Sequence, residues 1–466
     1  MVMAMEHPAL LIALPLLFSF LAPMVYYASR RSVRPYTAAV LALNALLSLW
    51  LLYYVRTGHT VMEVIAGFQP PVGIFLAVGN LGAVLAALIN TFALINYIAY
   101  WGEGEDSLRF SMLYILATAG ATGIVITGDL FNMFVFFEIT AVASYGLVAA
   151  RNTGEAYEGA VKYIIMGSVG SSFLLIGIGL IYGSLKTLNF YDIAARVGDM
   201  PETTRLLAFL FLITGIGVEA ELFPLNGWVP DAYQGSRRYV AAFLSFGASK
   251  AAIYAVARVI FTMMTFSRAY DLALVLGVIT LLAGELAAFR QKDPRRMLAY
   301  SSIGQMGLIL VALSMRSTEG LIAALFLMVG HAASKGILFI AVNGYTRGSL
   351  RDPVRGTAIV VAVLSLIGMP PFAGFWGKWH LVMAMSDMDV FLPLMLVLLA
   401  TVVEALYYSR FIYRGMGSPG GVASPSYTDR VALAAFALLL MAFGLYPGLV
   451  YNAGLRAAQS LLGGDL

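Results

Sequence analysis

Residues 319–346 read EGLIAALFLMVGHAASKGILFIAVNGYT, a long apolar run that begins at Glu319 and has His331 and Lys335 in its interior. A helix needs about 20 mainly apolar residues to cross a bilayer core that is about 30 Å thick. His331 and Lys335 are four residues apart, so a helix places them on the same face. The stretch therefore predicts a membrane-spanning helix with two ionisable groups on one side.

The whole chain has the composition of this stretch. Of its 466 residues, 60% are hydrophobic and 12% are charged, whereas soluble domains average about 25% charged residues. The mean hydropathy is +0.84. A membrane barrel would alternate apolar and polar residues in strands of about 10 residues, and the sequence shows no such alternation. These features predict an all-α integral membrane protein in a lipid bilayer.

The apolar runs predict about fourteen membrane-spanning helices, separated by short polar gaps. The shortest gap is Gly128–Asp129, between the fourth and fifth helices. The predicted spans are 8–28, 36–56, 73–100, 110–128, 130–150, 159–183, 204–225, 238–263, 269–289, 297–315, 319–346, 356–386, 391–413 and 431–452. The first run is expected to be a retained helix, because no basic segment and no obvious cleavage site accompany it.

Basic residues predict the orientation. The loops that follow odd-numbered helices carry 17 Lys and Arg residues, and the other loops and the C-terminus carry 7. The basic loops should be cytoplasmic, which leaves both termini on the outer side of the plasma membrane. The net charge of +4 follows from the same bias, and we expect no nucleic-acid partner.

Two predicted spans are interrupted in a similar way. Proline and glycine break the seventh span at Pro224 and the twelfth at Pro370–Pro371, because proline removes a backbone donor and clashes with the preceding turn. Breaks at matching places of two halves predict a transport site at a repeat interface. Helices 4–8 and 9–13 would then be two five-helix repeats, the second inverted. The expected regions are 1–109, 110–263, 269–413 and 414–466.

Several ionisable residues remain inside the predicted spans. A charge at the centre of a membrane helix costs about 2.5–3.5 kcal/mol on insertion scales, so such residues need a reason to be there. Arg258 and Lys162 lie near span ends, where snorkelling or a structural ion pair accounts for them. The other residues recur through several helices and predict a polar pathway: Glu138, Glu219, Glu221, Lys250, Glu285, His331, Lys335, Lys378 and Glu404.

Glu219 and Glu221 are alternatives within this pathway. They are two residues apart, about 200° around a helix, so we expect at most one of them to face a given cavity. Both could instead lie near the membrane surface.

The chain contains no cysteine, which excludes disulfides, iron–sulfur ligation and thiolate metal sites. The four histidines are scattered without ligand spacing. We therefore expect neither a cofactor nor a metal site in this chain.

Six motifs occur in a characteristic order along the chain. They are DLFNMFVFFE at 129–138, FPLNGWVPDAY at 223–233, ASKAAIYAVAR at 248–258, DPRRMLAYSSIGQMG at 293–307, HAASKGILF at 331–339 and MPPFAGFWGK at 369–378. These motifs resemble those of the D-type component of multisubunit cation/proton antiporters and of the antiporter-like subunits of respiratory complex I. The same motifs are found in membrane-bound hydrogenases and related sulfur-reducing complexes. The resemblance covers roughly residues 70–415.

The resemblance implies proton-path roles for particular residues. Glu138 matches the family's fifth-helix glutamate, Lys250 the eighth-helix lysine, His331 the eleventh-helix histidine and Lys378 the twelfth-helix lysine. Together with Glu219, Lys335 and Glu404, these residues form the predicted ion path.

The chain departs from the family's pattern at three places. The family's seventh-helix lysine falls on Glu219, its histidine before Gly-Trp is Asn226, and an alanine-proline stretch is replaced by 235–239, GSRRY. The departures suggest the hydrogenase or sulfur-reducing branch. If Glu219 faces Glu138, two carboxylates would share one proton or one small cation and titrate as a unit.

The predicted function is movement of H⁺, Na⁺ or both by a transport subunit of a larger complex. Its partners would be other membrane subunits and hydrophilic redox subunits. Two other interpretations are an autonomous secondary transporter and a quinone-binding redox subunit. The lack of metal ligands counts against a quinone-binding redox subunit. Carboxylates and lysines at the broken helices suit small cations better than an organic solute, which counts against a solute transporter.

Overall fold

The computed structural model describes residues 7–59, 61–68, 73–103, 108–342, 344–417 and 425–462. Parts of the predicted regions 1–109 and 414–466, and one residue of the predicted span 319–346, lie outside these residues. The described chain is mostly helical, and twelve of its helices are long and apolar enough to cross a membrane. The prediction of an all-α membrane fold is therefore confirmed.

The N-terminal region contains three long helices and a short hairpin. Its elements are α1 (Leu10–Ala28), α2 (Val33–Arg56), β1 (Val61–Val64), β2 (Phe75–Val78) and α3 (Asn80–Tyr100). β1 and β2 pair antiparallel, with Val61 opposite Val78. The hairpin was not predicted, because eight residues in two strands are too few for a clear alternation.

The next region ends in a distorted helix. Its elements are α4 (Leu108–Ile126), α5 (Leu130–Ala149), α6 (Gly154–Leu185), α7 (Phe190–Arg196), α8 (Glu202–Glu219), α9 (Val229–Gly235), α10 (Arg238–Phe243) and α11 (Ser249–Arg258). Two π-helical turns, Leu244–Ala248 and Val259–Met263, continue α10 and α11. The predicted turn at Gly128–Asp129 is present, and the Asp129 side chain accepts a hydrogen bond from the Asn132 N–H at the start of α5.

The remaining helices complete the bundle. They are α12 (Ser267–Arg290), α13 (Pro294–Ser314), α14 (Thr318–Ala341), α15 (Pro353–Ile367), α16 (Ala373–Asp387), α17 (Phe391–Gly415), α18 (Tyr427–Leu445) and α19 (Gly448–Leu462).

Most predicted spans differ from the observed helices by a few residues at their ends, and four differ more. The span 73–100 begins with β2, and its helix α3 starts only at Asn80. The span 204–225 ends as a helix at Glu219, and the span 356–386 is divided into α15 and α16. These are the two predicted breaks. The span 431–452 was wrong as a single helix, because α18 ends at Leu445 and α19 begins after Pro447.

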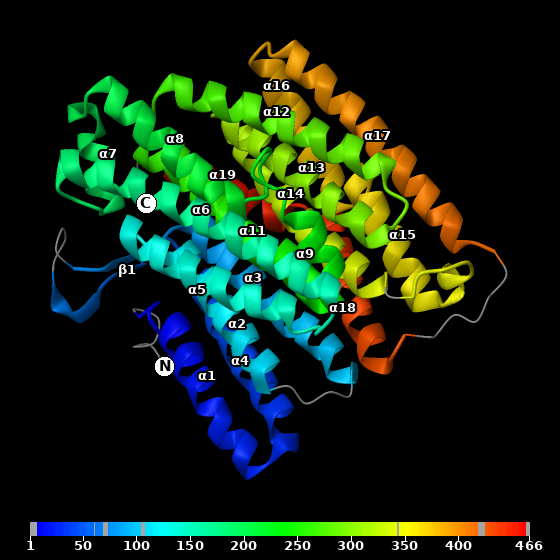
Figure 1. Cartoon of the computed structure of the whole chain (residues 1–466). Coiled ribbons are helices and arrows are strands. Elements are labelled where there is room, and N and C mark those ends of the chain that lie inside the picture. Colours follow the sequence, from blue (N-terminus) through cyan, green and yellow to red (C-terminus); the bar gives the residue numbers. More distant parts are fainter. Residues whose placement is uncertain are drawn as a thin grey trace.

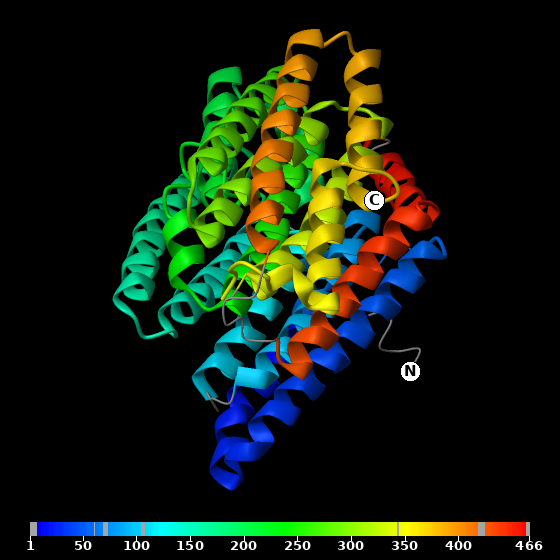
Figure 2. The ribbon, with the colours of Figure 1, turned by 90° about the vertical axis from the view of Figure 1, so that its right-hand side faces the viewer.

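Burial separates central helices from peripheral ones. The apolar window of α14 and that of the segment 238–263 are wholly buried within the chain, whereas those of α1 and α17 are 28% buried. α14 lies in the middle of the molecule, with α1 and α17 at opposite edges (Figure 1). Figure 2 shows the same separation from the side. The central helices carry Lys250, His331 and Lys335.

Candidate functional site

The break after α15 places a lysine against a helix end. Gly368 ends the helix with a φ of 90°, in the left-handed region that glycine favours. The side chain of Lys378 passes over it from α16, and its Nζ donates a hydrogen bond of 3.1 Å to the carbonyl of Ile367. A cation at a helix C-terminus is favourable, because the unpaired carbonyls there carry partial negative charge.

We call the seven predicted path residues the row. Lys378 forms a buried ion pair within it. Its Nζ lies 2.7 Å from Oε2 of Glu404 on α17, and the Glu404 side chain is 2% exposed. The other oxygen of Glu404 accepts a 2.7 Å hydrogen bond from Gln305 on α13. Glu285, on α12, is buried in the same region, within electrostatic range of Glu404 and Lys378. Three helices thus converge on one lysine.

Lys335 lies between this cluster and His331. Its Nζ donates to the carbonyl of Leu298 at 2.9 Å and to the Tyr408 hydroxyl at 3.3 Å. The Tyr408 hydroxyl in turn lies 2.9 Å from the hydroxyl of Ser301. Lys335 has no exposed surface, so a carbonyl and hydroxyls take the place of water around it.

Lys250 and His331 meet at the centre of the bundle. The Lys250 Nζ is in hydrogen-bond contact with Nδ1 of His331, and it donates to the Ser245 carbonyl at 2.9 Å. Ser245 lies in the first π-helical turn, where the Ser249 N–H bonds to the Leu244 carbonyl. The wider π turn loosens the regular backbone pairing, and the Ser245 carbonyl faces the lysine.

Glu219 ends α8 and is held by a tyrosine. The Tyr163 hydroxyl on α6 donates a 2.6 Å hydrogen bond to Oε2 of Glu219. The Tyr163 ring stacks on Trp228, with centroids 3.6 Å apart, and meets the edge of Tyr145. Glu219 is 9% exposed, so the surrounding helices enclose its carboxylate.

Glu221 is buried as well, although the prediction was that at most one of the two carboxylates faces a given cavity. That prediction assumed a continuous helix, but α8 ends at Glu219 and Glu221 has a φ of 61°. The direction of the Glu221 side chain is therefore not set by the helical rotation of α8. It accepts a 2.5 Å hydrogen bond from the Tyr233 hydroxyl on α9.

Glu138 lies at the other end of the row, on α5. It is half-buried, and its Oε1 accepts a hydrogen bond from the Ser171 hydroxyl on α6. The helices that carry Glu138 and Glu219, α5 and α8, both pack against α6.

The structure places five of the seven predicted path residues in the buried core, whereas Glu138 and Lys378 are partly exposed. Glu138, Glu219, Lys250, His331, Lys335, Lys378 and Glu404 follow one another through α5, α8, α11, α14, α16 and α17. Sequence reasoning missed the tyrosines Tyr163, Tyr233 and Tyr408. The chain has 25 tyrosines, and nothing in the sequence separates these three from packing residues.

Lys162 was expected either to snorkel or to form a structural ion pair, and the structure shows the ion pair. Its Nζ lies 2.6 Å from both Glu158 and Asp231. Arg296 on α13 binds the other oxygen of Asp231 at 2.5 Å. Burial opposes ionisation of Asp231, but the hydrogen bonds from Lys162 and Arg296 outweigh it and hold the pKa of this carboxyl below its ordinary 3.8.

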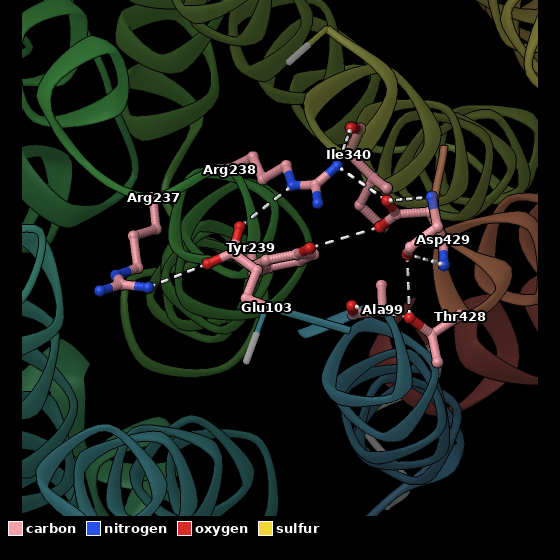
Figure 3. A network of polar contacts seen from close by, with 9 residues as sticks. Ala99, Glu103, Arg237, Arg238, Tyr239, Ile340, Thr428 and Asp429 are labelled. Carbon is pink, nitrogen blue, oxygen red and sulfur yellow. Dashed lines mark hydrogen bonds and ion pairs between the residues drawn. The ribbon is translucent and has the colours of Figure 1, made fainter. Parts of the chain in front are cut away.

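The arginines at 237 and 238 form a second anchor, which Figure 3 shows. Arg237 Nη1 lies 2.9 Å from Glu103, and Arg238 lies 3.1 Å from Asp429 on α18. The Tyr239 hydroxyl donates to Asp429 at 3.3 Å. The network fixes the start of the distorted helix that carries Lys250.

No three His, Asp or Glu side chains converge as metal ligands in the part of the chain that the structure describes. The row instead combines buried carboxylates, amines, an imidazole and hydroxyls, which are groups that accept and donate protons.

Residues 127–404 match the family model described as the transmembrane part of NADH:quinone oxidoreductase and the Mrp antiporter. The chain belongs to this family. The matched NADH:quinone oxidoreductase/Mrp antiporter region begins just before α5 and ends at Glu404, so it contains the whole row from Glu138 onwards.

Two relatives within this family align with the chain over most of their length. The N-type component of the NADH-quinone oxidoreductase of Desulforudis audaxviator is 31% identical over 90% of this chain and 89% of its own length. The D-type component of the Na⁺/H⁺ antiporter of Alkalihalophilus pseudofirmus is 28% identical over 80% of each chain.

A solved structure of the family has the same fold. A chain of the membrane-bound sulfane sulfur reductase, an archaeal respiratory membrane complex, superposes with a TM-score of 0.92 at 34% identity over 98% of each chain. The predicted superfamily is thereby confirmed. The chain is an ion-translocating, antiporter-type membrane subunit of a multisubunit complex, a transport subunit rather than a catalytic one.

Proposed function

We propose that the chain moves protons, alone or in exchange for Na⁺, along the row from Glu138 to Lys378 and Glu404. The observation that carries the proposal is the direct contact between Lys250 and His331 at the centre of the bundle. A second direct contact joins Lys378 to Glu404, and the hydroxyls of Tyr163 and Tyr408 bind Glu219 and Lys335.

The chemistry of the row suits stepwise proton transfer. At the Lys250–His331 contact, a proton passes between an amine and an imidazole, two groups that can each hold it. At Lys335, the Tyr408 hydroxyl can accept from the lysine and donate onward. Near Glu219, the Tyr163 hydroxyl has the same dual capacity. Buried water would bridge the remaining gaps.

The resemblance to the sulfane sulfur reductase chain, at 34% identity, supports assembly with other membrane subunits and with hydrophilic redox subunits. We infer a membrane-bound hydrogenase-like or sulfur-reducing complex in the plasma membrane, with both termini outside. The bias of 17 against 7 basic loop residues supports this orientation.

The finer architecture is part of the same proposal. Twelve long apolar helices, the interrupted α8 and the broken pair α15–α16 would make fourteen spans. The regions 110–263 and 269–413 would be inverted repeats, preceded by 1–109 and followed by 414–466. In such repeats Glu219 and Lys378 occupy corresponding broken helices, with opposite charges.

The test uses the chain in its native assembly. The complex is affinity-purified through a tag on this chain, its subunits are identified, and it is reconstituted in sealed vesicles. We expect hydrophilic redox subunits to co-purify, and turnover to produce a pH gradient or uptake of labelled Na⁺. Purification of the chain alone with full cation/proton exchange would instead identify an autonomous antiporter. Neither ion moving would contradict the proposal.

A further inference from the structure

Arg258, at the end of α11, is a buried cation outside the row. It is 5% exposed, and its Nε and Nη2 are buried without a hydrogen-bond partner among the described residues. Its guanidinium lies over the rings of Phe190 and Tyr191, at 5.1 and 6.0 Å from their centroids. Aromatic faces attract a cation, and the Tyr191 hydroxyl also acts on the guanidinium as a neutral hydrogen-bond partner, but neither supplies a negative charge.

No carboxylate forms an ion pair with Arg258 in the described part of the chain, where the charged or titratable groups that act on it are the tyrosines Tyr191 and Tyr254. Moving a guanidinium out of water loses hydration free energy, and attraction to a counter-charge is needed to offset that loss. Burial without a counter-charge is therefore unfavourable. Arg258 therefore has an unmet requirement for an anion.

The guanidinium lines a cavity of about 170 Å³ that a helix N-terminus also lines. Residues 79–82, at the start of α3, form one wall, and no side chain caps this helix. The first N–H groups of a helix have no intrahelical partner, and they carry partial positive charge. Thr262, Thr265 and Ser460 also line the cavity, together with Tyr191 and Tyr254.

We propose that this cavity, the Arg258 cavity, binds a phosphate group. Arginine presents a planar fork of donors that matches phosphate oxygens, and helix N-termini bind phosphate through backbone N–H groups. Both features converge here on one space.

The surroundings indicate two possible sources of the phosphate. A wider hollow of about 420 Å³ adjoins the Arg258 cavity, since both are lined by Asn80 and Ser460, and it adds Arg56 and Arg456. Arg56 also lines an apolar cavity of about 270 Å³ between α2, α3, α14, α18 and α19. Free phosphate could enter through the hollow. A phospholipid could place its headgroup there and an acyl chain in the apolar cavity.

The experiment compares the intact complex carrying wild-type chain, Arg258→Gln or Arg268→Gln. Arg268 is a matched control, because it is 67% exposed and pairs with Glu202 at 2.9 Å. Each complex is delipidated and titrated with inorganic phosphate or with a short-chain phosphatidic acid. Thermal unfolding is followed, since a ligand of the folded state raises Tm by mass action.

We expect a saturable rise in Tm for wild type and for Arg268→Gln. The half-saturating concentration should be at least about 30-fold higher for Arg258→Gln, since loss of one partner of a buried charged contact weakens binding at least that much. A response to inorganic phosphate identifies free phosphate as a sufficient ligand. A response to the lipid alone identifies a headgroup site.

The proposal is overturned if neither probe raises the Tm of wild type, or if Arg258→Gln responds as wild type does. Should Arg258→Gln not assemble, Arg258→Lys keeps the charge and removes the planar fork. Weaker binding is then expected in a folded complex, and unchanged binding would contradict the assignment.

Discussion

The row has two halves, and the buried charged groups have different kinds of partner in each. The first half-path, Glu138, Glu219, Glu221 and Lys250, holds its carboxylates through hydroxyls of serine and tyrosine. The second half-path, His331, Lys335, Lys378 and Glu404, contains a direct ion pair at 2.7 Å. Carboxylates thus predominate in the first half, whereas amines and an imidazole predominate in the second.

The difference indicates separate roles. Carboxylates held by neutral donors can gain or lose a proton, or accept a small cation, without breaking an ion pair. We propose that the Lys378–Glu404 pair is a gate of the path, since opening it would change which groups the ammonium and the carboxylate can reach. Lys250 in the first half-path contacts His331 in the second, and this contact joins the two halves.

The largest effect should come from Lys378→Ala. It leaves Glu404 as a buried charge without its partner, which costs about 3–5 kcal/mol, and we expect ion transport to be lost. Vesicle transport and thermal unfolding of the assembled complex measure both effects. Arg268→Ala breaks an exposed pair and should cost less than about 1 kcal/mol. An assembled Lys378→Ala complex with normal transport would show that the second half-path carries no ions.

The link between the halves is tested by His331→Gln. Glutamine fills a similar space but cannot hold the proton that Lys250 passes, so transport should fall about 100-fold or more. The control is His380→Gln, a histidine that pairs with Glu319 at 2.5 Å outside the row. Equal losses in both variants would point to a packing role for His331.

The first half-path is tested at Glu219. Glu219→Gln removes titration, and Glu219→Lys restores the residue type that the family has there but buries a cation beside the Tyr163 hydroxyl. We expect both to reduce transport and change its pH profile, and Glu219→Lys to be the more damaging. Wild-type activity across pH in both variants would exclude Glu219 from the path.

A tyrosine partner should matter less than the carboxylate that it holds. Tyr163→Phe removes the donor to Glu219 and should destabilise the protein by about 1–3 kcal/mol. The matched control is Tyr182→Phe, on the same helix and 52% exposed. If Tyr163→Phe unfolds at the wild-type temperature with unchanged transport, the hydroxyl contributes nothing to the site.

The smallest effect should come from Asp231, which links Lys162 on α6 to Arg296 on α13. Because its folded pKa is lowered, its stabilisation is present above pH 3.8 and is lost as pH falls through the lower folded value. Asp231→Asn should cost about 1 kcal/mol near neutrality and remove this acid dependence. An unchanged acid unfolding curve would contradict this.

The sequence predicted the helical membrane fold, the two breaks and the members of the row, because long apolar runs, prolines and intramembrane charges are strong local signals. It did not predict that both Glu219 and Glu221 are buried, since that depends on where α8 ends. The tyrosine partners also escaped prediction, because a hydroxyl within an apolar helix has no distinctive spacing. The pairing of β1 with β2 and the separate helix α19 depend on tertiary contacts, which the sequence of a short segment does not reveal.

The central claim, that ions move along this row, is tested most directly at Glu138. Ion transport by the intact complex in sealed vesicles is compared for wild type, Glu138→Gln and the control Asp199→Asn, whose side chain is 71% exposed. Glutamine keeps the shape of Glu138 but cannot titrate. We predict that Glu138→Gln assembles normally and transports no ions, while Asp199→Asn behaves as wild type. Undiminished transport by an assembled Glu138→Gln complex would contradict the proposed path.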